Sequence, residues 1–270
     1  AFKIRPNNLD EFVGQKHLVG DTGPIRVATK EKKLFSFILW GPPGSGKTTL
    51  GRIYANSLGA NFVELSAVSA GKDEIRQIVA NKTLSPTVLF LDEIHRFNKA
   101  QQDFLLPYVE SGRITLIGAT TENPSFEVIP ALLSRVKVFV LNQLSDTEME
   151  TILKRANIKI EDDALKEIIN FSDGDARLAI GSLETTHELY GEVSVENLFK
   201  ALQEKRVKYA RLGEEHYNLI SAFIKSMRAS NPDSALYYLG RMIEAGEDPK
   251  FIARRMVIFA SEDVGLEDPK

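Results

Sequence analysis

Residues 41–48 of this chain read Gly41-Pro42-Pro43-Gly44-Ser45-Gly46-Lys47-Thr48. This stretch decides the fold, because it matches the phosphate-binding pattern G-x-x-x-x-G-K-[ST] at every fixed position. An apolar run over residues 35–40 precedes it, and an apolar helical face that ends at Gly59 follows it. Strand, glycine-rich loop and helix, in this order, are the context that the pattern requires. The sequence therefore predicts a P-loop rather than a glycine-rich turn with an exposed lysine.

The residue types of this loop suit the binding of nucleotide phosphates and Mg²⁺. Glycines let the backbone turn sharply, so that successive N–H groups and the N-terminus of the next helix face the β-phosphate. Lys47 adds a positive charge for the β- and γ-phosphates, and Thr48 offers a hydroxyl to Mg²⁺. We expect ATP to be bound here by Pro43, Gly44, Ser45, Gly46, Lys47, Thr48 and Thr49.

A second informative stretch, residues 87–93, ends in two carboxylates. Apolar residues lead to Asp92 and Glu93, which is typical of a buried parallel strand. Ligands bind at the carboxyl edge of such sheets. Asp92 is placed to hold Mg²⁺ through water, and Glu93 to accept a proton from an attacking water. The alternative, a strand before a solvated acidic turn, is disfavoured because a P-loop precedes it in a repeated β/α pattern.

The first half of the chain has the periodicity of an α/β fold. Helical patterns alternate with five apolar runs, over residues 35–40, 61–65, 87–93, 114–121 and 136–141. This alternation predicts a doubly wound parallel five-stranded sheet. The fourth run ends in Thr120 and Thr121, either of which could hydrogen-bond the γ-phosphate. Threonine is also simply a common strand residue.

The N-terminal arm, residues 5–15, carries apolar side chains between Pro6 and Gly14. Beside a nucleotide loop, Val13 and Gly14 could line a pocket for the base. The arm could equally be a packed extension of the domain. The spacing of its residues favours neither interpretation.

From Ser145 onward the pattern changes to helices. Residues 145–148 form a capping box, and further helical patterns continue to residue 259. A basic linker over residues 205–211 separates two groups of them. The candidate contacts to nucleic acid are this linker, Arg96 and Lys99. For Arg96 and Lys99, a solvated start of a helix is the better explanation.

The composition of the chain limits the classes of protein to which it can belong. The chain has 270 residues, a formal charge of −3 and no cysteine, which excludes disulfides and thiolate metal sites. Its four histidines show no metal-ligand spacing. We expect neither a membrane span nor an N-terminal leader. With so little net charge, contact with nucleic acid must rest on local cations.

Six stretches carry a family resemblance, over residues 5–15, 39–44, 92–99, 117–126, 131–135 and 261–266. They resemble the AAA+ ATPases and, within them, the RarA/MgsA or Werner-helicase-interacting-protein family. The resemblance implies an α/β AAA+ P-loop ATPase domain at 1–142, an all-α lid at 143–204 and an all-α C-terminal oligomerisation domain at 205–270. After Ala156 the chain lacks part of the usual lid segment of that family, so either this lid is short or a segment of it is not covered by the sequence.

The resemblance also implies roles for three residues around the ATP. Thr121 would sense the γ-phosphate, and Arg177 would contact the ATP of its own chain as a second sensor. Arg135 would reach the ATP of a neighbouring subunit as an arginine finger. Position supports this last role, because Arg135 enters the final strand from the end opposite to the P-loop. An ordinary surface arginine is the alternative.

The function that the resemblance implies is ATP hydrolysis, with Mg²⁺, in the maintenance of replication forks and in recombination. Implied partners are DNA with single-stranded regions, duplex ends or forks, further copies of the chain in a tetramer, and single-stranded-DNA-binding protein. The implied location is the cytoplasm, at the nucleoid. A clamp-loader-like switch and a junction-migration motor of the RuvB type stay open. A small-molecule kinase is not supported, since it would need neither Arg135 nor a helical C-terminal domain.

Overall fold

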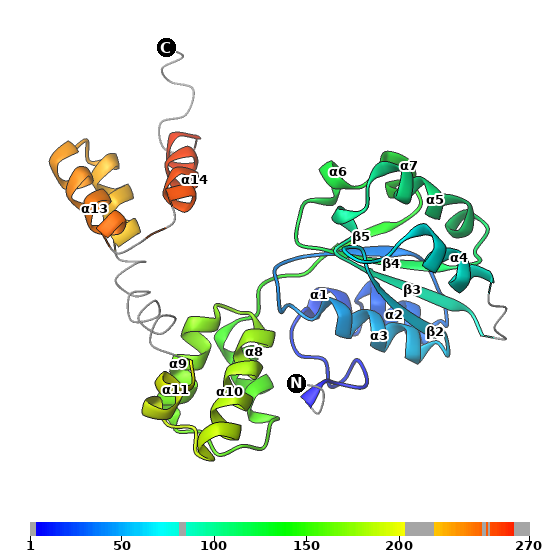
Figure 1. Ribbon diagram of the computed structural model, residues 1–270, viewed down its shortest axis with the longest axis horizontal. Helices are drawn as coiled ribbons and strands as arrows, with labels where there is room; N and C mark the ends of the chain where they lie inside the picture. The colour runs from blue at the N-terminus through cyan, green and yellow to red at the C-terminus, as the bar shows by residue number, and fades with distance from the viewer. Residues whose placement is uncertain (1–3, 81–84, 203–218, 245–246, 248, 262–270) are drawn as a thin grey trace, which may run out of the picture. The chain divides into compact units, whose positions relative to one another are not determined.

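The computed structural model describes residues 4–80, 85–202, 219–244, 247 and 249–261. By its contacts the chain divides into two compact units, Ala1–Ser194 and Val195–Lys270. Figure 1 shows the helices and strands of both. The predicted division into three domains, with boundaries after residues 142 and 204, stays a prediction.

A five-stranded parallel sheet forms the centre of the first unit, with the strand order β2-β3-β4-β1-β5. Its strands are β1 (Phe37–Trp40), β2 (Asn61–Ser66), β3 (Thr87–Asp92), β4 (Thr115–Thr120) and β5 (Lys137–Val140). The predicted doubly wound parallel sheet is thereby confirmed. The register pairs Trp40 with Thr120, and Leu91 with Gly118. The carboxyl ends of β1, β3 and β4 therefore meet at one edge, where α/β folds bind ligands.

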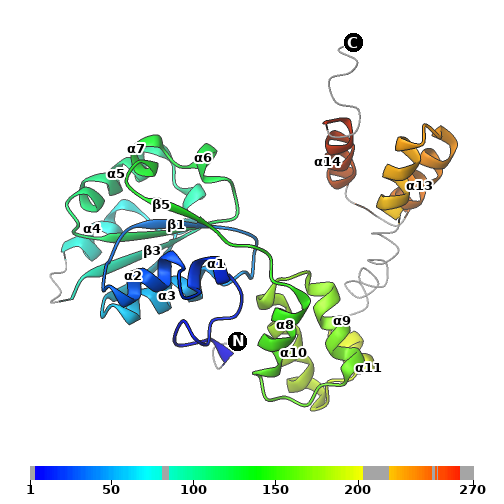
Figure 2. The same ribbon diagram turned by 180° about the vertical axis from the view of Figure 1, so that it is seen from behind.

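Helices cover both faces of this sheet, as Figures 1 and 2 show. One face carries α1 (Lys16–Val19), α2 (Pro24–Lys30) and α3 (Lys47–Ser57). The other carries α4 (Lys72–Ala80), α5 (Lys99–Glu110), α6 (Pro124–Glu127) and α7 (Pro130–Leu133). Because both faces are covered, β1, β3 and β4 are almost continuously buried, which explains their uninterrupted apolar sequences.

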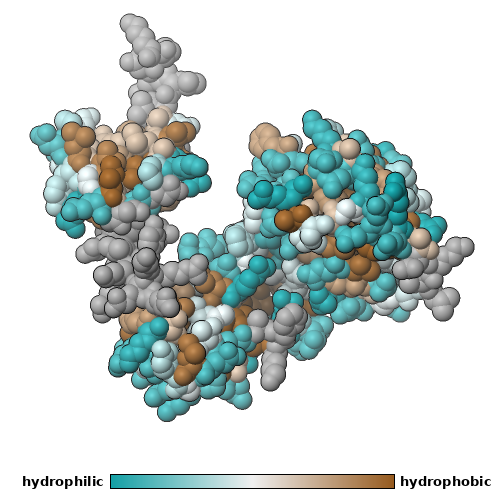
Figure 3. All heavy atoms as spheres, in the orientation of Figure 1, coloured by the Kyte–Doolittle hydropathy of each residue, from teal (hydrophilic) through white to brown (hydrophobic). Residues whose placement is uncertain are grey.

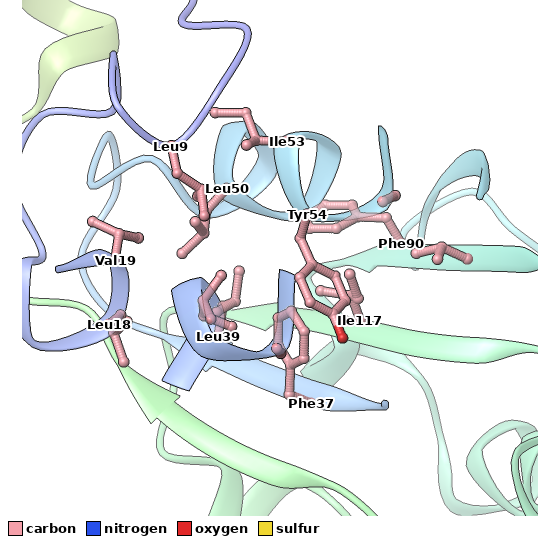
Figure 4. Packing of buried hydrophobic residues seen from close by; sticks show 14 of the residues in the cluster. Leu9, Leu18, Val19, Phe37, Leu39, Leu50, Ile53, Tyr54, Phe90 and Ile117 are labelled. Atoms are coloured by element: carbon pink, nitrogen blue, oxygen red, sulfur yellow. The ribbon is translucent and has the colours of Figure 1, made fainter. Parts of the chain in front are cut away.

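Helix α3 anchors the P-loop to the sheet. Its buried residues Leu50, Ile53 and Tyr54 recur at helical spacing and so share one face. Figure 4 shows Leu50 and Tyr54 directed toward Leu39 and Phe37 of β1, and the rings of Tyr54 and Phe37 lie 5.1 Å apart. Fully burying a side chain such as Leu50 stabilises the fold by roughly 1.5–3 kcal/mol. The loop before α3 is thus attached to the best-packed part of the domain.

Side-chain caps fix where several helices begin. Asn98 and Gln101 form a capping box at the start of α5, as predicted. Ser145 and Glu148 form the second predicted box, at the start of α8 (Asp146–Lys154). The remaining helices of the first unit are α9 (Asp162–Ser172) and α10 (Ala176–Tyr190), and α8, α9 and α10 contact one another.

In its described residues the second unit consists of helices and the turns that join them. It contains α11 (Val195–Ala201), helical residues 219–228, α13 (Pro232–Glu244) and α14 (Pro249–Phe259). Ile220, Phe223 and Met242 lie in its core. Hydrophobic residues are also visible on the surface of this unit in Figure 3, and α13 exposes Leu236 and Ile243. The predicted basic linker 205–211 lies outside the described residues.

Within the described ranges, every helix is too short or too polar to cross a membrane.

Candidate nucleotide-binding site

A cavity lies at the carboxyl edge of the central strands, between the P-loop and the helices α8 and α10. The residues that line it come from the N-terminal arm, the P-loop, the ends of β3 and β4, and these two helices: Ile4, Arg5, Pro6, Phe12, Val13, Pro43, Gly44, Ser45, Gly46, Lys47, Thr48, Thr49, Asp92, Glu93, Thr121, Leu144, Ile152, Arg155, Ala176, Arg177 and Ile180. Of the sequence-predicted site residues, all except Gly14 and Arg135 line this cavity. The roles assigned to them stay predictions.

The P-loop has the backbone conformation that its glycines allow. Gly44 and Gly46 have φ values of 68° and 96°, in the left-handed region that side chains disfavour. Gly46 caps α3, which begins at Lys47, so the N-terminus of a buried helix is directed into the loop. This arrangement supplies N–H groups and a partial positive charge for an anion.

Lys47 is folded back onto its own loop. Its Nζ donates hydrogen bonds to the carbonyl oxygens of Gly41 at 2.8 Å and Pro42 at 2.7 Å. Burial lowers the pKa of Lys47, while the nearby carboxylates of Asp92 and Glu93 oppose that shift. A phosphate beside this ammonium would replace neutral carbonyl partners with charged ones and favour the protonated form.

Two close contacts explain why residues 44 and 46 are glycine. A Cβ atom at Gly44 would lie 2.0 Å from Oδ1 of Asp175, and one at Gly46 would lie 2.8 Å from the ring of Phe12. Asp175 is the N-cap of α10, where it accepts hydrogen bonds from the backbone N–H groups of Arg177 and Leu178. The N-terminus of α10 therefore packs directly on the P-loop, which brings Arg177 to the cavity.

The two carboxylates that follow β3 differ in backbone conformation. Asp92 ends the strand, and its Oδ1 accepts a hydrogen bond of 3.1 Å from the backbone N–H of Glu93. Glu93 has φ 55° and ψ 44°, a left-handed conformation that costs energy for a residue with a side chain. This turn directs the chain into a short 3-10 helix, η2 (Ile94–Arg96), and leaves both carboxylates at the cavity.

Thr120 is the last residue of β4, and Thr121, which follows it, lines the cavity. Thr120 is fully buried, and its hydroxyl accepts a hydrogen bond from the backbone N–H of Glu122 at 2.9 Å. The same hydroxyl lies 3.0 Å from Nδ1 of His95. The structure thus distinguishes two threonines that the strand pattern by itself left as alternatives.

Gly14 and Arg135 lie outside the cavity wall. Gly14, with φ 82°, packs against Leu144, while the next residue, Gln15, exchanges two hydrogen bonds with the backbone of Asn142. These contacts fix the N-terminal arm to the segment between β5 and α8. Gly14 therefore supports the wall that Val13 lines.

Arg135 stands before β5, near the end of the sheet opposite to the P-loop. Lys137, the first residue of β5, pairs with Phe37, the first residue of β1. The Arg135 guanidinium forms an ion pair with Glu110 of α5 and donates to the carbonyl oxygen of Ala131 at 2.6 Å. Its side chain is 40% exposed, so it remains available to another molecule.

The oxygen donors of the cavity fit Mg²⁺. Thr48 and Asp92 both line it, and among the residues that the structure describes there is no cluster of three or more metal-ligating side chains. Mg²⁺ is ordinarily held by one or two protein oxygens together with waters and substrate phosphates, rather than by an all-protein cage. Thr48 and Asp92 are therefore a sufficient protein contribution.

Sequence reasoning missed part of the cavity wall, namely Leu144, Ile152, Arg155 and Ile180. Ile152 with Arg155, and Arg177 with Ile180, are each three residues apart and so share a helix face. Helical spacing from Arg177 could have identified Ile180. No sequence pattern within α8 or the P-loop indicates that the two lie side by side.

Three family models match consecutive parts of the chain. They are "ATPase family associated with various cellular activities" at residues 37–144, "AAA C-terminal domain" at 154–228 and "MgsA AAA+ ATPase C terminal" at 229–270. The chain is 45% identical to replication-associated recombination protein A of Coxiella burnetii, over all of this chain and 66% of that protein. It is 38% identical to the Bacillus subtilis protein of the same name, over all of this chain and 68% of that protein.

The chain belongs to the replication-associated recombination protein A family. The predicted family and the AAA+ fold are thereby confirmed. The chain spans about two thirds of the length of these curated relatives. It is also similar to the solved structure of the RuvB Holliday junction branch migration motor of Thermotoga maritima, with a TM-score of 0.66 and 28% identity, over 83% of this chain and 80% of that chain.

Proposed function

We propose that this chain hydrolyses ATP to ADP and phosphate at interfaces between copies of itself, and that DNA stimulates the reaction. One observation supports this most strongly. A P-loop lysine, two strand-end carboxylates and the N-terminus of α10 converge on a single cavity. Arg135 lies away from that cavity, which is the placement expected of a residue that serves a neighbouring site.

Each group of the cavity then has a defined task. The N–H groups of the P-loop and Lys47 hold the β- and γ-phosphates. Thr48 and Asp92 would hold Mg²⁺, which supplies charge neutralisation on the phosphate oxygens when it is bound. The apolar wall of Val13, Ile152 and Ile180 receives the base.

Glu93 acts as the general base. A water oxygen forms a bond to the γ-phosphorus, the bond from that phosphorus to the bridging oxygen of ADP breaks, and Glu93 accepts the proton of the water. Thr121 and Arg177 orient the γ-phosphate from the same chain, and Arg135 of a neighbouring copy stabilises the charge that moves onto the leaving oxygen.

DNA with single-stranded regions, duplex ends or forks is the proposed effector. The names of the relatives support a role in replication and recombination. We further propose a homo-tetramer, action at the nucleoid, and contact with single-stranded-DNA-binding protein. The apolar side chains that the second unit exposes, including Leu236, Ile243 and Val257, support assembly with other copies.

A junction-migration motor is the second candidate, favoured by the likeness to the RuvB structure. A steady-state ATPase assay with single-stranded DNA, blunt duplexes, forks and four-way junctions separates the two, with Glu93→Gln as the inactive control. Stimulation by single strands, ends or forks supports the leading proposal, and sustained turnover on junctions alone supports the motor. Stimulation by a sliding clamp alone would instead indicate a clamp-loader-like switch. Wild-type turnover of Glu93→Gln would refute the assignment of the base.

A further inference from the structure

His95 connects two residues of the cavity edge that belong to neighbouring strands. Its Nε2 lies 3.1 Å from Oε2 of Glu93, and its Nδ1 lies 3.0 Å from Oγ1 of Thr120. The imidazole side chain is only 9% exposed, whereas the Glu93 side chain is 36% exposed. A nearly buried ring thus holds a half-exposed carboxylate that faces the cavity.

The hydrogen-bonding capacity of the three groups limits the directions that these contacts can take. A carboxylate only accepts, so the contact is favourable when Nε2 of His95 carries the proton that faces Glu93. In a neutral imidazole Nδ1 is then an acceptor for the Thr120 hydroxyl, which also lies 3.1 Å from the carbonyl oxygen of Glu122, a second acceptor for the same proton. The oxygen of that hydroxyl in turn accepts from the N–H of Glu122. The Thr120 hydroxyl thus contacts His95 and both backbone polar groups of Glu122.

The backbone around His95 leaves the ring little freedom. The left-handed conformation of Glu93 reverses the direction of the chain. As a result, η2 contacts β4. Ile94 is fully buried there, and a Cβ atom at Gly118 would lie 3.0 Å from its Cδ1. Gly118 therefore makes room for Ile94, and Ile94 fixes the turn that carries His95.

We propose that His95 is a positioning residue for Glu93, and that it ties the orientation of this base to the end of β4, where Thr121 meets the γ-phosphate. The proposal rests on the proposed role of Glu93 as the base. One of the two Glu93 carboxylate oxygens is engaged by the imidazole, which fixes the rotation of the carboxylate and leaves the other oxygen for the water. A displacement of the strand end by the γ-phosphate is transmitted through Thr120 and His95 to Glu93.

The test uses substitutions that remove one side-chain group at a time. Thr120→Val removes the hydroxyl at nearly constant volume, and Thr120→Ser keeps it, so the second is the matched control of the first. His95→Ala removes the ring, and His95→Gln keeps a side-chain donor of similar reach. For each variant, the full chain is assayed for kcat with DNA, for ATP affinity by calorimetry and for melting temperature.

We expect His95→Ala and Thr120→Val to lower kcat roughly 10- to 100-fold, the cost of a misplaced catalytic group, with ATP affinity unchanged. Thr120→Ser should retain wild-type kcat, and His95→Gln should recover part of it. In a Glu93→Gln background, neither His95→Ala nor Thr120→Val should lower the residual turnover further, because both act through the lost base.

Three results would overturn the proposal. They are wild-type kcat in a folded His95→Ala or Thr120→Val variant, a raised kcat in either, or an equal loss with and without the Glu93 carboxylate. If His95→Ala fails to fold, the Thr120→Val and Thr120→Ser pair decides alone, since both variants keep His95. Wild-type turnover of Glu93→Gln would refute the proposed base itself, which is a separate outcome from failure of the positioning role.

Discussion

Replacing Arg135 with alanine separates a catalytic effect from a structural one. In the folded chain the guanidinium pairs with Glu110 on the surface, where the two side chains are 40% and 47% exposed. Loss of so exposed a pair should lower the free energy of unfolding by less than about 1 kcal/mol. If Arg135 serves the ATP of a neighbour, the same substitution should lower turnover by roughly 10³-fold or more. That is equivalent to about 4 kcal/mol of activation free energy, too much to follow from the lost ion pair.

The matched control is Glu110→Gln, which breaks the same ion pair and leaves the arginine in place. We expect Glu110→Gln to keep wild-type turnover, and Arg135→Ala to keep ATP affinity while losing hydrolysis. The assay is steady-state phosphate release at saturating ATP and DNA, beside ATP binding measured by calorimetry. A parallel loss in both variants would show that the ion pair, and not the guanidinium, is what matters.

Mixing of variants tests whether the arginine acts between subunits. An Arg135→Ala chain keeps its ATP site, and a Lys47→Ala chain keeps its arginine. In an equal mixture, about one quarter of head-to-tail interfaces would combine the intact halves, so about one quarter of wild-type turnover should return. If the two variants co-assemble and the mixture stays inactive, the reasoning is wrong. Wild-type turnover in diluted monomers would also refute it.

Three further predictions concern ATP, the P-loop and DNA. Burial lowers the pKa of Lys47, so the folded chain loses this charge at a lower pH than the unfolded chain does. ATP affinity by calorimetry should therefore fall as pH rises through that lowered pKa, and Lys47→Arg, whose guanidinium stays protonated, should flatten the profile. Gly44→Ala should weaken ATP binding and lower the melting temperature, since its Cβ would meet Asp175, whereas Gly59→Ala, with open space around it, should cost only the roughly 1–2 kcal/mol of a left-handed alanine. Lys99→Glu should weaken DNA binding and reduce its salt dependence, and unchanged affinity in a salt titration would remove Lys99 from the contact surface.

The parts of this protein that the sequence predicts are those encoded by contiguous residues. The P-loop between a buried strand and a helix needs only residues 35–59, and the capping boxes at Asn98 and Ser145 need four residues each. The acids after β3 follow from one apolar run. In each case the physical cause, a backbone conformation or a local hydrogen bond, acts over a few residues.

The contacts that complete the site could not be predicted in the same way. Asp175 reaches Gly44 across more than a hundred residues, and His95 meets Thr120 because β3 and β4 are neighbours in the sheet. Strand order and the packing of α8 and α10 decide these contacts, and neither leaves a periodic signal in the chain. A histidine without metal-ligand spacing therefore gave no sign of its place beside Glu93.

The two hydrogen bonds between Gln15 and Asn142 have a mechanical consequence. The amide of Gln15 both donates to and accepts from the backbone of the segment that joins the sheet to α8. If α8 and α10 rotate away from the P-loop, either these two hydrogen bonds break or the N-terminal arm moves with the helices. We expect the N-terminal arm and the segment between β5 and α8 to rotate together. One rotation would then change both the contact of the arm with the base and the distance of Arg177 from the phosphates.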